Sequence, residues 1–159
     1  MQLHYTRCPM ISRKETVMNN HFSGCNCAQS VFAAYYDIFG GIEDRDTALK
    51  LALSFGGGLA RTQGICGAAY GGIMLLGLKY APASGATAEE VWAYHNLVRD
   101  FLKDFAEING SAYCRDIIRC DITTPEGYSS IPEHLKENCT LAIKSAADLL
   151  EDKYGILEK

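Results

Sequence analysis

Cysteine is the residue type with which this sequence could do chemistry. Seven are present, at Cys8, Cys25, Cys27, Cys66, Cys114, Cys120 and Cys139. An odd number of cysteines in a chain with no usual secretory signal disfavours a disulfide framework, which leaves reactive thiols, metal ligands or buried core cysteines. Cys66 stands out because it lies in the segment GGGLARTQGICGAAYGG, residues 56–72, which also contains seven glycines and Arg61.

The spacing of the cysteines disfavours several common sites. No C-x-x-C pair is present, which disfavours a zinc ribbon, thioredoxin chemistry and covalent c-type haem. The cysteine run of ferredoxins is also absent. The glycine-rich segment lacks the Lys-Ser/Thr ending of a P-loop. No recognisable ligand spacing relates the four histidines, which are His4, His21, His95 and His134.

The apolar periodicity of the sequence is helical almost throughout. Helices are expected over residues 26–39, 44–55, 65–80, 87–108, 114–119 and 132–154, with residues 121–132 as a loop and no convincing strand. The sequence therefore predicts an all-α fold, a compact bundle of about five to six helices. We expect a single helical domain over residues 1–159, with residues 1–15 as an N-terminal extension.

Four cysteines fall on separate expected elements, namely Cys27, Cys66, Cys114 and Cys139. Cys27 and Cys66 lie in the first turn of a helix and Cys114 opens a short turn, where free backbone N–H groups favour a thiolate. This effect is about 0.3–1 kcal/mol, less than one pKa unit, so Arg61, Arg115 or a bound metal would have to add to it. Cys139 lies on an apolar stripe, and burial as a small apolar side chain stays an alternative for each cysteine.

Small residues recur at every fourth position around Cys66, as Gly64, Ala68 and Gly72 and as Gly67 and Gly71. Each glycine inside a helix costs about 0.5–1 kcal/mol relative to alanine. Close approach of another helix, or access to the thiol, must offset that cost. We expect Gly64 and Gly67 to provide backbone room beside Cys66 and, with Arg61, to contact a cofactor bound there.

Four segments, in this order, carry a family resemblance: NCAQSVFAAY, FGGGLARTQGICGAAYGGIMLLGLKY, CRDIIRCD and CTLAIKSAADLLEDKYG. Over roughly residues 20–155 the chain resembles the C_GCAxxG_C_C family of small proteins described as redox-active. The family pattern falls on Cys27, on Cys66 with Gly67, Ala68 and Gly71, and on Cys114 and Cys139. Cys8, Cys25 and Cys120 are additional to the pattern, and Cys25 could replace Cys27 as a ligand, as Cys120 could replace Cys114.

The resemblance implies a redox-active protein and leaves its chemistry open. A related domain occurs in split-Soret cytochromes, where an iron–sulfur site has been proposed, whereas their haem-binding sequence is absent from this chain. The leading interpretation is a metal centre, most naturally an iron–sulfur cluster, held by Cys27, Cys66, Cys114 and Cys139 for electron transfer or sensing. The alternatives are a metal-free thiol–disulfide oxidoreductase, with Cys66 as an exposed thiol of low pKa, and a helical interaction module with inert cysteines.

Composition limits the partners that we expect. The formal net charge is -4 and no basic run exceeds two residues, so nothing indicates nucleic-acid binding. The longest uncharged apolar stretch, residues 65–78, is shorter than the roughly 20 residues of a membrane span. We therefore expect a cytoplasmic protein with a redox partner that the sequence does not identify. The glycine-rich helix faces are compatible with a homodimer.

Overall fold

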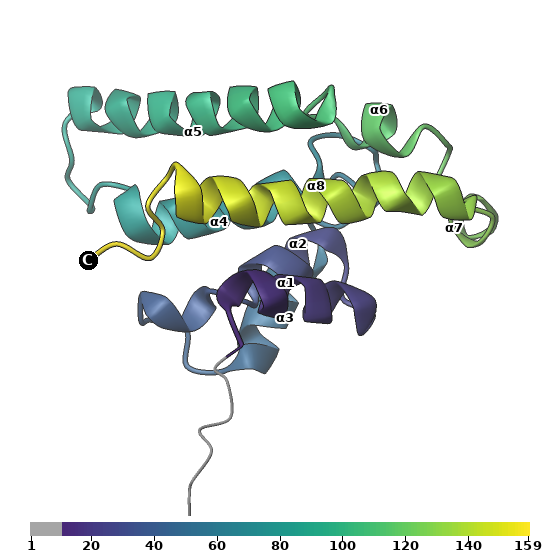
Figure 1. Ribbon diagram of the computed structural model, residues 1–159. Coiled ribbons are helices and arrows are strands. Elements are labelled where there is room, and N and C mark those ends of the chain that lie inside the picture. Colours follow the sequence, from purple (N-terminus) through teal and green to yellow (C-terminus); the bar gives the residue numbers. More distant parts are fainter. Residues whose placement is uncertain (1–10) are drawn as a thin grey trace, which may run out of the picture.

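The computed structural model describes residues 11–159, and this part of the chain is all-α, as the sequence predicted (Figure 1). The elements are α1 (Arg13–Phe22), α2 (Cys27–Phe32), the 3-10 helix η1 (Tyr36–Ile38), α3 (Arg45–Leu53), α4 (Gly67–Tyr80), α5 (Ala88–Asn109), α6 (Cys114–Ile118), α7 (Pro125–Ser129) and α8 (Glu133–Asp152). Among these residues no strand forms, and the only β-type pairing is an isolated antiparallel bridge between Ile65 and Tyr113.

Two helices were not predicted. Helix α1 begins after Ser12, whose side chain accepts a hydrogen bond from the backbone of Glu15 while the Glu15 carboxylate accepts one from the backbone of Ser12. This reciprocal capping box was visible in the sequence, but α1 is short and buries only Val17 and Asn20, so its apolar periodicity is weak. Helix α7 lies inside the expected loop and begins with Pro125 at its first position, where a missing N–H costs little.

The expected helix over residues 26–39 is shorter than predicted. Helix α2 ends at Phe32, and after Ala33 the backbone N–H groups of Ala34 and Tyr35 bond three residues back instead of four. The carbonyl of Ala34 accepts a hydrogen bond from Arg13 at 2.9 Å. The chain then turns so that the fully buried Tyr35 donates its hydroxyl to Glu151 at 2.8 Å.

Helix α8 packs against the most helices, namely α1, α2, α4, α5 and α6, and α4 packs against α2, α5 and α8. Helix α5 runs antiparallel to α8 along one side of the molecule, and α1, α2 and α3 lie on the other side of α8 (Figure 1). The contact between α4 and α2 is the closest, since a Cβ atom at Gly71 would lie 2.8 Å from the carbonyl oxygen of Ala28. The glycine spacing in α4 therefore serves helix packing at this position. None of the helices in residues 11–159 has the length and hydropathy needed to cross a membrane.

Candidate functional site

A pocket of about 680 Å³ is lined by cysteines from several elements. Cys27 of α2, Cys114 of α6 and Cys139 of α8 line it, as does Cys25 from the segment between α1 and α2. Cys66 does not line the pocket, since its side chain is buried at the beginning of α4 with 5% of its surface exposed. The fold thus brings three of the four predicted site cysteines to one cavity. The fourth, Cys66, is buried in the protein interior and does not reach the cavity surface.

Two backbone hydrogen bonds bring Cys66 and Cys114 together. The N–H of Cys66 donates to the carbonyl of Ala112 at 2.8 Å, and the N–H of Cys114 donates to the carbonyl of Gly64 at 2.7 Å. These bonds flank the bridge between Ile65 and Tyr113. The beginning of α4 is therefore attached to the beginning of α6, although the two segments are almost fifty residues apart in the sequence.

The other two cysteines are positioned by side-chain contacts of their neighbours. Cys27 is the first residue of α2, whose N-cap Asn26 accepts from the backbone of Gln29 and donates to the carbonyl of Leu53 at 2.9 Å. Next to Cys139, Asn138 donates to the carbonyl of Ile117 at 3.0 Å, which holds α8 against α6. Each cysteine is thus adjacent to a residue that fixes its helix to another element.

Two glycines make direct room for these cysteines. A Cβ atom at Gly67 would lie 3.0 Å from the sulfur of Cys27 and 2.8 Å from the carbonyl oxygen of Phe55. A Cβ atom at Gly58 would lie 2.8 Å from the Cβ of Cys114. Any larger residue at these two positions would displace the site. The room predicted beside Cys66 at Gly67 is in fact occupied by the sulfur of Cys27.

The glycine-rich segment has an unusual left-handed backbone. Residues 57–61 have φ angles of 64°, 72°, 71°, 50° and 62°, and three of them, Leu59, Ala60 and Arg61, are not glycine. A non-glycine residue in this region costs about 1–2 kcal/mol. Hydrogen bonds within the segment oppose this cost, among them Arg61 N–H to Gly56 O at 3.2 Å. The segment places the guanidinium of Arg61 over the ring of Tyr128 in α7, with 3.8 Å between the guanidinium carbon and the ring centre.

Burial controls the protonation of the thiols. Desolvation raises the pKa of Cys66 well above its ordinary value, and a negative charge on Cys27 or Cys114 raises it further. The N–H groups of Ala68 and Ala69 act in the opposite direction, but their effect is smaller. The expectation of an exposed Cys66 thiol of low pKa is therefore wrong, because the loss of hydration raises the pKa by more than the N–H groups at the beginning of the helix lower it.

Burial acts in the same direction on two thiols of the pocket, those of Cys114 and Cys139. Desolvation, followed by the charge of Cys27, raises the pKa of Cys114 to about 12 and that of Cys139 to about 12. Charge on Cys120 also contributes to both shifts. The thiols of Cys66, Cys114 and Cys139 are therefore protonated at neutral pH.

The geometry of these side chains differs from that of a single-ion metal site. Among residues 11–159, no group of three or more His, Cys, Asp or Glu side chains is placed to hold a metal ion. The side chains as they lie therefore do not form a site for a single ion such as zinc. Their chemistry, four thiols around one cavity, is nevertheless that of a soft-metal donor set.

The additional cysteines differ in position. Cys25 lines the pocket, and its sulfur accepts a long hydrogen bond from the guanidinium of Arg45 at 3.9 Å. The same guanidinium donates a hydrogen bond to the side-chain oxygen of Asn20 at 2.8 Å. Cys120 does not line the pocket, and its carbonyl accepts a hydrogen bond from Gln63 at 2.8 Å. Cys8 lies outside the described residues.

Sequence reasoning missed Arg45 and Tyr128. Tyr128 was assigned to a loop, and Arg45 is sixteen residues from the nearest predicted site residue, Arg61. No sequence spacing connects either residue to a cysteine. Arg115, which was expected to support a thiolate, instead lies over the ring of Tyr113 at 5.0 Å.

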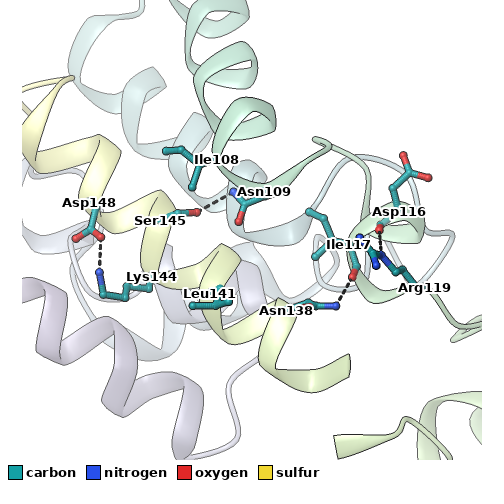
Figure 2. Close-up of a pocket in the computed structure, with 10 residues that line it drawn as sticks. All are labelled: Ile108, Asn109, Asp116, Ile117, Arg119, Asn138, Leu141, Lys144, Ser145 and Asp148. Atoms are coloured by element: carbon teal, nitrogen blue, oxygen red, sulfur yellow. Dashed lines mark hydrogen bonds and ion pairs between the residues drawn. The ribbon is translucent and has the colours of Figure 1, made fainter. Parts of the chain in front are cut away.

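A second pocket of about 330 Å³ lies between α5, α6 and α8 (Figure 2). It contains no cysteine, and its lining consists of Ile108, Asn109, Asp116, Ile117, Arg119, Asn138, Leu141, Lys144, Ser145 and Asp148. Its polar side chains bond to their neighbours, as Asn109 does to Ser145 at 2.8 Å and Lys144 to Asp148 at 2.6 Å. The bond of Asn109 to Ser145 joins α5 to α8, and that of Asn138 to the carbonyl of Ile117 joins α8 to α6, so we assign this pocket to the packing of the bundle.

The fold and the pocket together define a small all-α protein with four cysteines lining one cavity. The chain belongs to the family described as "Putative redox-active protein (C_GCAxxG_C_C)", whose model matches residues 25–153. The resemblance expected from the sequence is confirmed over this range, which includes every cysteine except Cys8. Searches of curated proteins and of solved structures found no match.

Proposed function

We propose that this redox-active protein holds an iron–sulfur cluster in the cysteine pocket and transfers electrons, or senses redox state, through it. The observation that carries the proposal is the convergence of Cys27, Cys114 and Cys139 on one cavity, with Cys66 attached next to Cys114 by backbone hydrogen bonds. Four cysteine thiolates are the common ligand set of such clusters. When bound, a cluster supplies one-electron oxidation and reduction.

The spread of the sulfurs around the cavity is compatible with a cluster. A single ion needs all its ligands at about 2.3 Å from one point, and the described side chains offer no such group. In a cluster site the cysteines bind different iron atoms, or at most two of them bind the same iron. The cysteine sulfurs of a cluster site therefore lie farther apart than those of a single-ion site. The proposal therefore concerns a cluster and not an isolated zinc or iron ion.

We assign the fourth ligand to Cys66 and not to Cys25. Cys66 directly precedes Gly67, where an added Cβ would lie 3.0 Å from the sulfur of Cys27, and its backbone bond to Ala112 attaches it beside Cys114, which supports this assignment. Cys25 lies in the segment between α1 and α2. Its sulfur is directed to Arg45 instead.

The chain's own residues have three tasks in this function. The thiols must lose their protons when metal binds, so loading releases protons and is favoured by higher pH. Gly58 and Gly67 keep the space that Cys114 and Cys27 occupy. The buried surroundings of Cys66 and Cys114 exclude water, which would otherwise reach the ligands.

The test is to purify the full chain without oxygen, reconstitute it with iron and sulfide, and count both per chain, with visible and paramagnetic resonance spectra. We expect Ser substitutions of Cys27, Cys66, Cys114 or Cys139 to reduce bound iron at least severalfold. Cys25→Ser and Cys120→Ser serve as matched controls and should keep the wild-type content. A wild-type chain that binds no iron under these conditions would refute the proposal, and a loss limited to Cys25→Ser in place of Cys66→Ser would change the fourth ligand.

Thiol–disulfide exchange is the second candidate function, and the contact of Arg45 with Cys25 favours it. A guanidinium beside a sulfur in an accessible pocket is an environment typical of reactive cysteines. In that case Cys25, not Cys66, would attack the disulfide of a partner. Mass spectrometry of the protein after treatment with a small disulfide would show a stable or resolved mixed disulfide at Cys25, and Arg45→Gln would slow its formation.

A further inference from the structure

We propose that the cysteine pocket also binds a small organic anion, a molecule with an apolar body and a carboxylate or similar oxyanion group, and that Arg61 recognises the charged group. This inference goes beyond the proposed cluster and does not require it. It depends on the size, lining and charge of the pocket and on the free edge of one guanidinium.

The size and lining of the pocket suit an organic ligand. Its volume of about 680 Å³ falls within the range of small-molecule sites, about 300–1,000 Å³. Aliphatic side chains form much of the wall, contributed by Leu53, Ile118, Ile122, Ile131 and Ile143. A few polar groups accompany this apolar wall, which is the usual pattern of a pocket that fixes the orientation of its ligand.

The charge of the lining indicates an anion. The chain has a formal net charge of -4, yet no Asp or Glu is among the residues that line this pocket. Two cations line it, Arg61 and Lys136. Lys136 pairs with the exposed Glu133 at 2.9 Å. Burial lowers the pKa of His21, the other basic residue of the lining, so that side chain is not a third cation at neutral pH.

Arg61 is the cation that remains available. Among residues 11–159, no carboxylate lies within ion-pair distance of its guanidinium, and its side chain makes no hydrogen bond. The guanidinium uses its flat face on the ring of Tyr128, at 3.8 Å. The N–H groups at its edge are left to bind an oxyanion in the plane, as arginine does in paired contacts with carboxylates.

The backbone holds Arg61 in this position. Its φ of 62° belongs to the left-handed run of residues 57–61, so the direction of the side chain is set by the segment and not by rotamer choice alone. Tyr128 on the other side of the guanidinium comes from α7, and both residues line the pocket. The anion-binding edge is thus presented to the cavity by two separate segments of the chain.

The test uses the full chain, purified without oxygen, with 2-naphthoate as probe and its neutral counterpart 2-naphthamide as control ligand. Binding is followed by isothermal titration. We expect 2-naphthoate to bind, 2-naphthamide to bind at least about tenfold more weakly, and Arg61→Gln to weaken 2-naphthoate binding by about tenfold to a hundredfold, as for a charge-assisted hydrogen bond. Arg99→Gln is the matched control, because Arg99 also lies over an aromatic ring, that of Trp92 at 5.0 Å, but does not line the pocket; it should bind as the wild type does.

The proposal is overturned if the wild type binds no 2-naphthoate, if 2-naphthamide binds equally well, or if Arg61→Gln binds like the wild type. Should Arg61→Gln fold poorly, Arg61→Gly replaces it, since glycine tolerates the left-handed φ without strain. Iron content, measured on the same samples, separates the two proposals. If the wild type binds iron but Arg61→Gln binds 2-naphthoate as tightly as the wild type does, only the anion site is contradicted. If the wild type binds no iron but binds 2-naphthoate, and Arg61→Gln weakens that binding, only the cluster is contradicted.

Discussion

Gly71→Ala tests whether the glycines of α4 exist to bring α2 close. A Cβ atom at Gly71 would lie 2.8 Å from the carbonyl oxygen of Ala28 and 3.0 Å from the Cβ of Val31, so backbone must move. Overpacking of this kind costs about 1–3 kcal/mol. Alanine is more favourable than glycine inside a helix by about 0.8–1 kcal/mol. The net loss in the free energy of unfolding is therefore about 0–2 kcal/mol.

A second glycine of the same helix separates the two effects. At Gly77 the nearest atom to an added Cβ is the hydroxyl of Tyr94, at 3.2 Å, which is the far end of a flexible side chain. Gly77→Ala should therefore gain the helix preference without the overpacking. The difference in unfolding free energy between Gly71→Ala and Gly77→Ala isolates the overpacking and should be about 1–3 kcal/mol.

Urea unfolding of the two variants, with a check that the slope with denaturant is unchanged, measures this difference. For a chain of this length it corresponds to about 2–4 °C in melting temperature for each kcal/mol. Equal free energies for the two variants would show that α2 and α4 are not in close contact at Gly71. The reasoning about the whole Gly67 and Gly71 spacing would then fail.

Three further predictions concern pH, the glycine-rich segment and the core. In the folded chain the pKa values of Cys114 and Cys139 are about 12, above the value of about 8.5 for unfolded thiols, so the free energy of unfolding of the reduced, metal-free chain should fall as pH rises above about 8.5. Urea midpoints from pH 7.5 to 10 measure this fall. It should be shallower in Cys114→Ala, and an identical pH dependence in that variant would contradict the assignment. Gly58→Ala should destabilise the fold by more than about 2 kcal/mol, because its φ of 72° is left-handed and the added Cβ would meet the backbone nitrogen of Gly64 at 2.6 Å; thermal unfolding equal to that of the wild type would argue against this geometry. Tyr35→Phe should cost about 1–2 kcal/mol in chemical denaturation, since it removes the hydrogen bond to Glu151 at 2.8 Å; Tyr113→Phe, at a hydroxyl with no such bond among the described residues, is the control and should be neutral.

The sequence by itself determined the helical class and most of the long helices. Helix α5 agrees with the range expected from residue 87 to residue 108: it begins with a capping box of Thr87 and Glu90 and ends before Gly110, which has a left-handed φ of 79°. Such signals are local, because a helix is built from hydrogen bonds between residues four apart and from caps within one turn. The expected beginning near Ile65 was only slightly early, since Cys66 is the N-cap of α4.

The sequence was also enough to recognise the family, because the family pattern is defined by the order and spacing of cysteine and glycine residues along the chain. It did not contain the short elements. Helix α1, α7 and the turn after Phe32 are stabilised by distant partners, such as the contact of Arg13 with the carbonyl of Ala34, and their own periodicity is too brief to predict them.

Only the tertiary structure decided which cysteines meet and in what state. Cys66 and Cys114 are joined through backbone bonds to Ala112 and Gly64, and such long-range pairing leaves no spacing to detect in the chain. The pKa of Cys66 is shifted in the direction opposite to the one expected from the sequence. The beginning of a helix favours a thiolate by about 0.3–1 kcal/mol, whereas loss of hydration on burial shifts a pKa by up to several units. Burial is a property of the folded surroundings, so no reading of residues near Cys66 in the sequence could have supplied it.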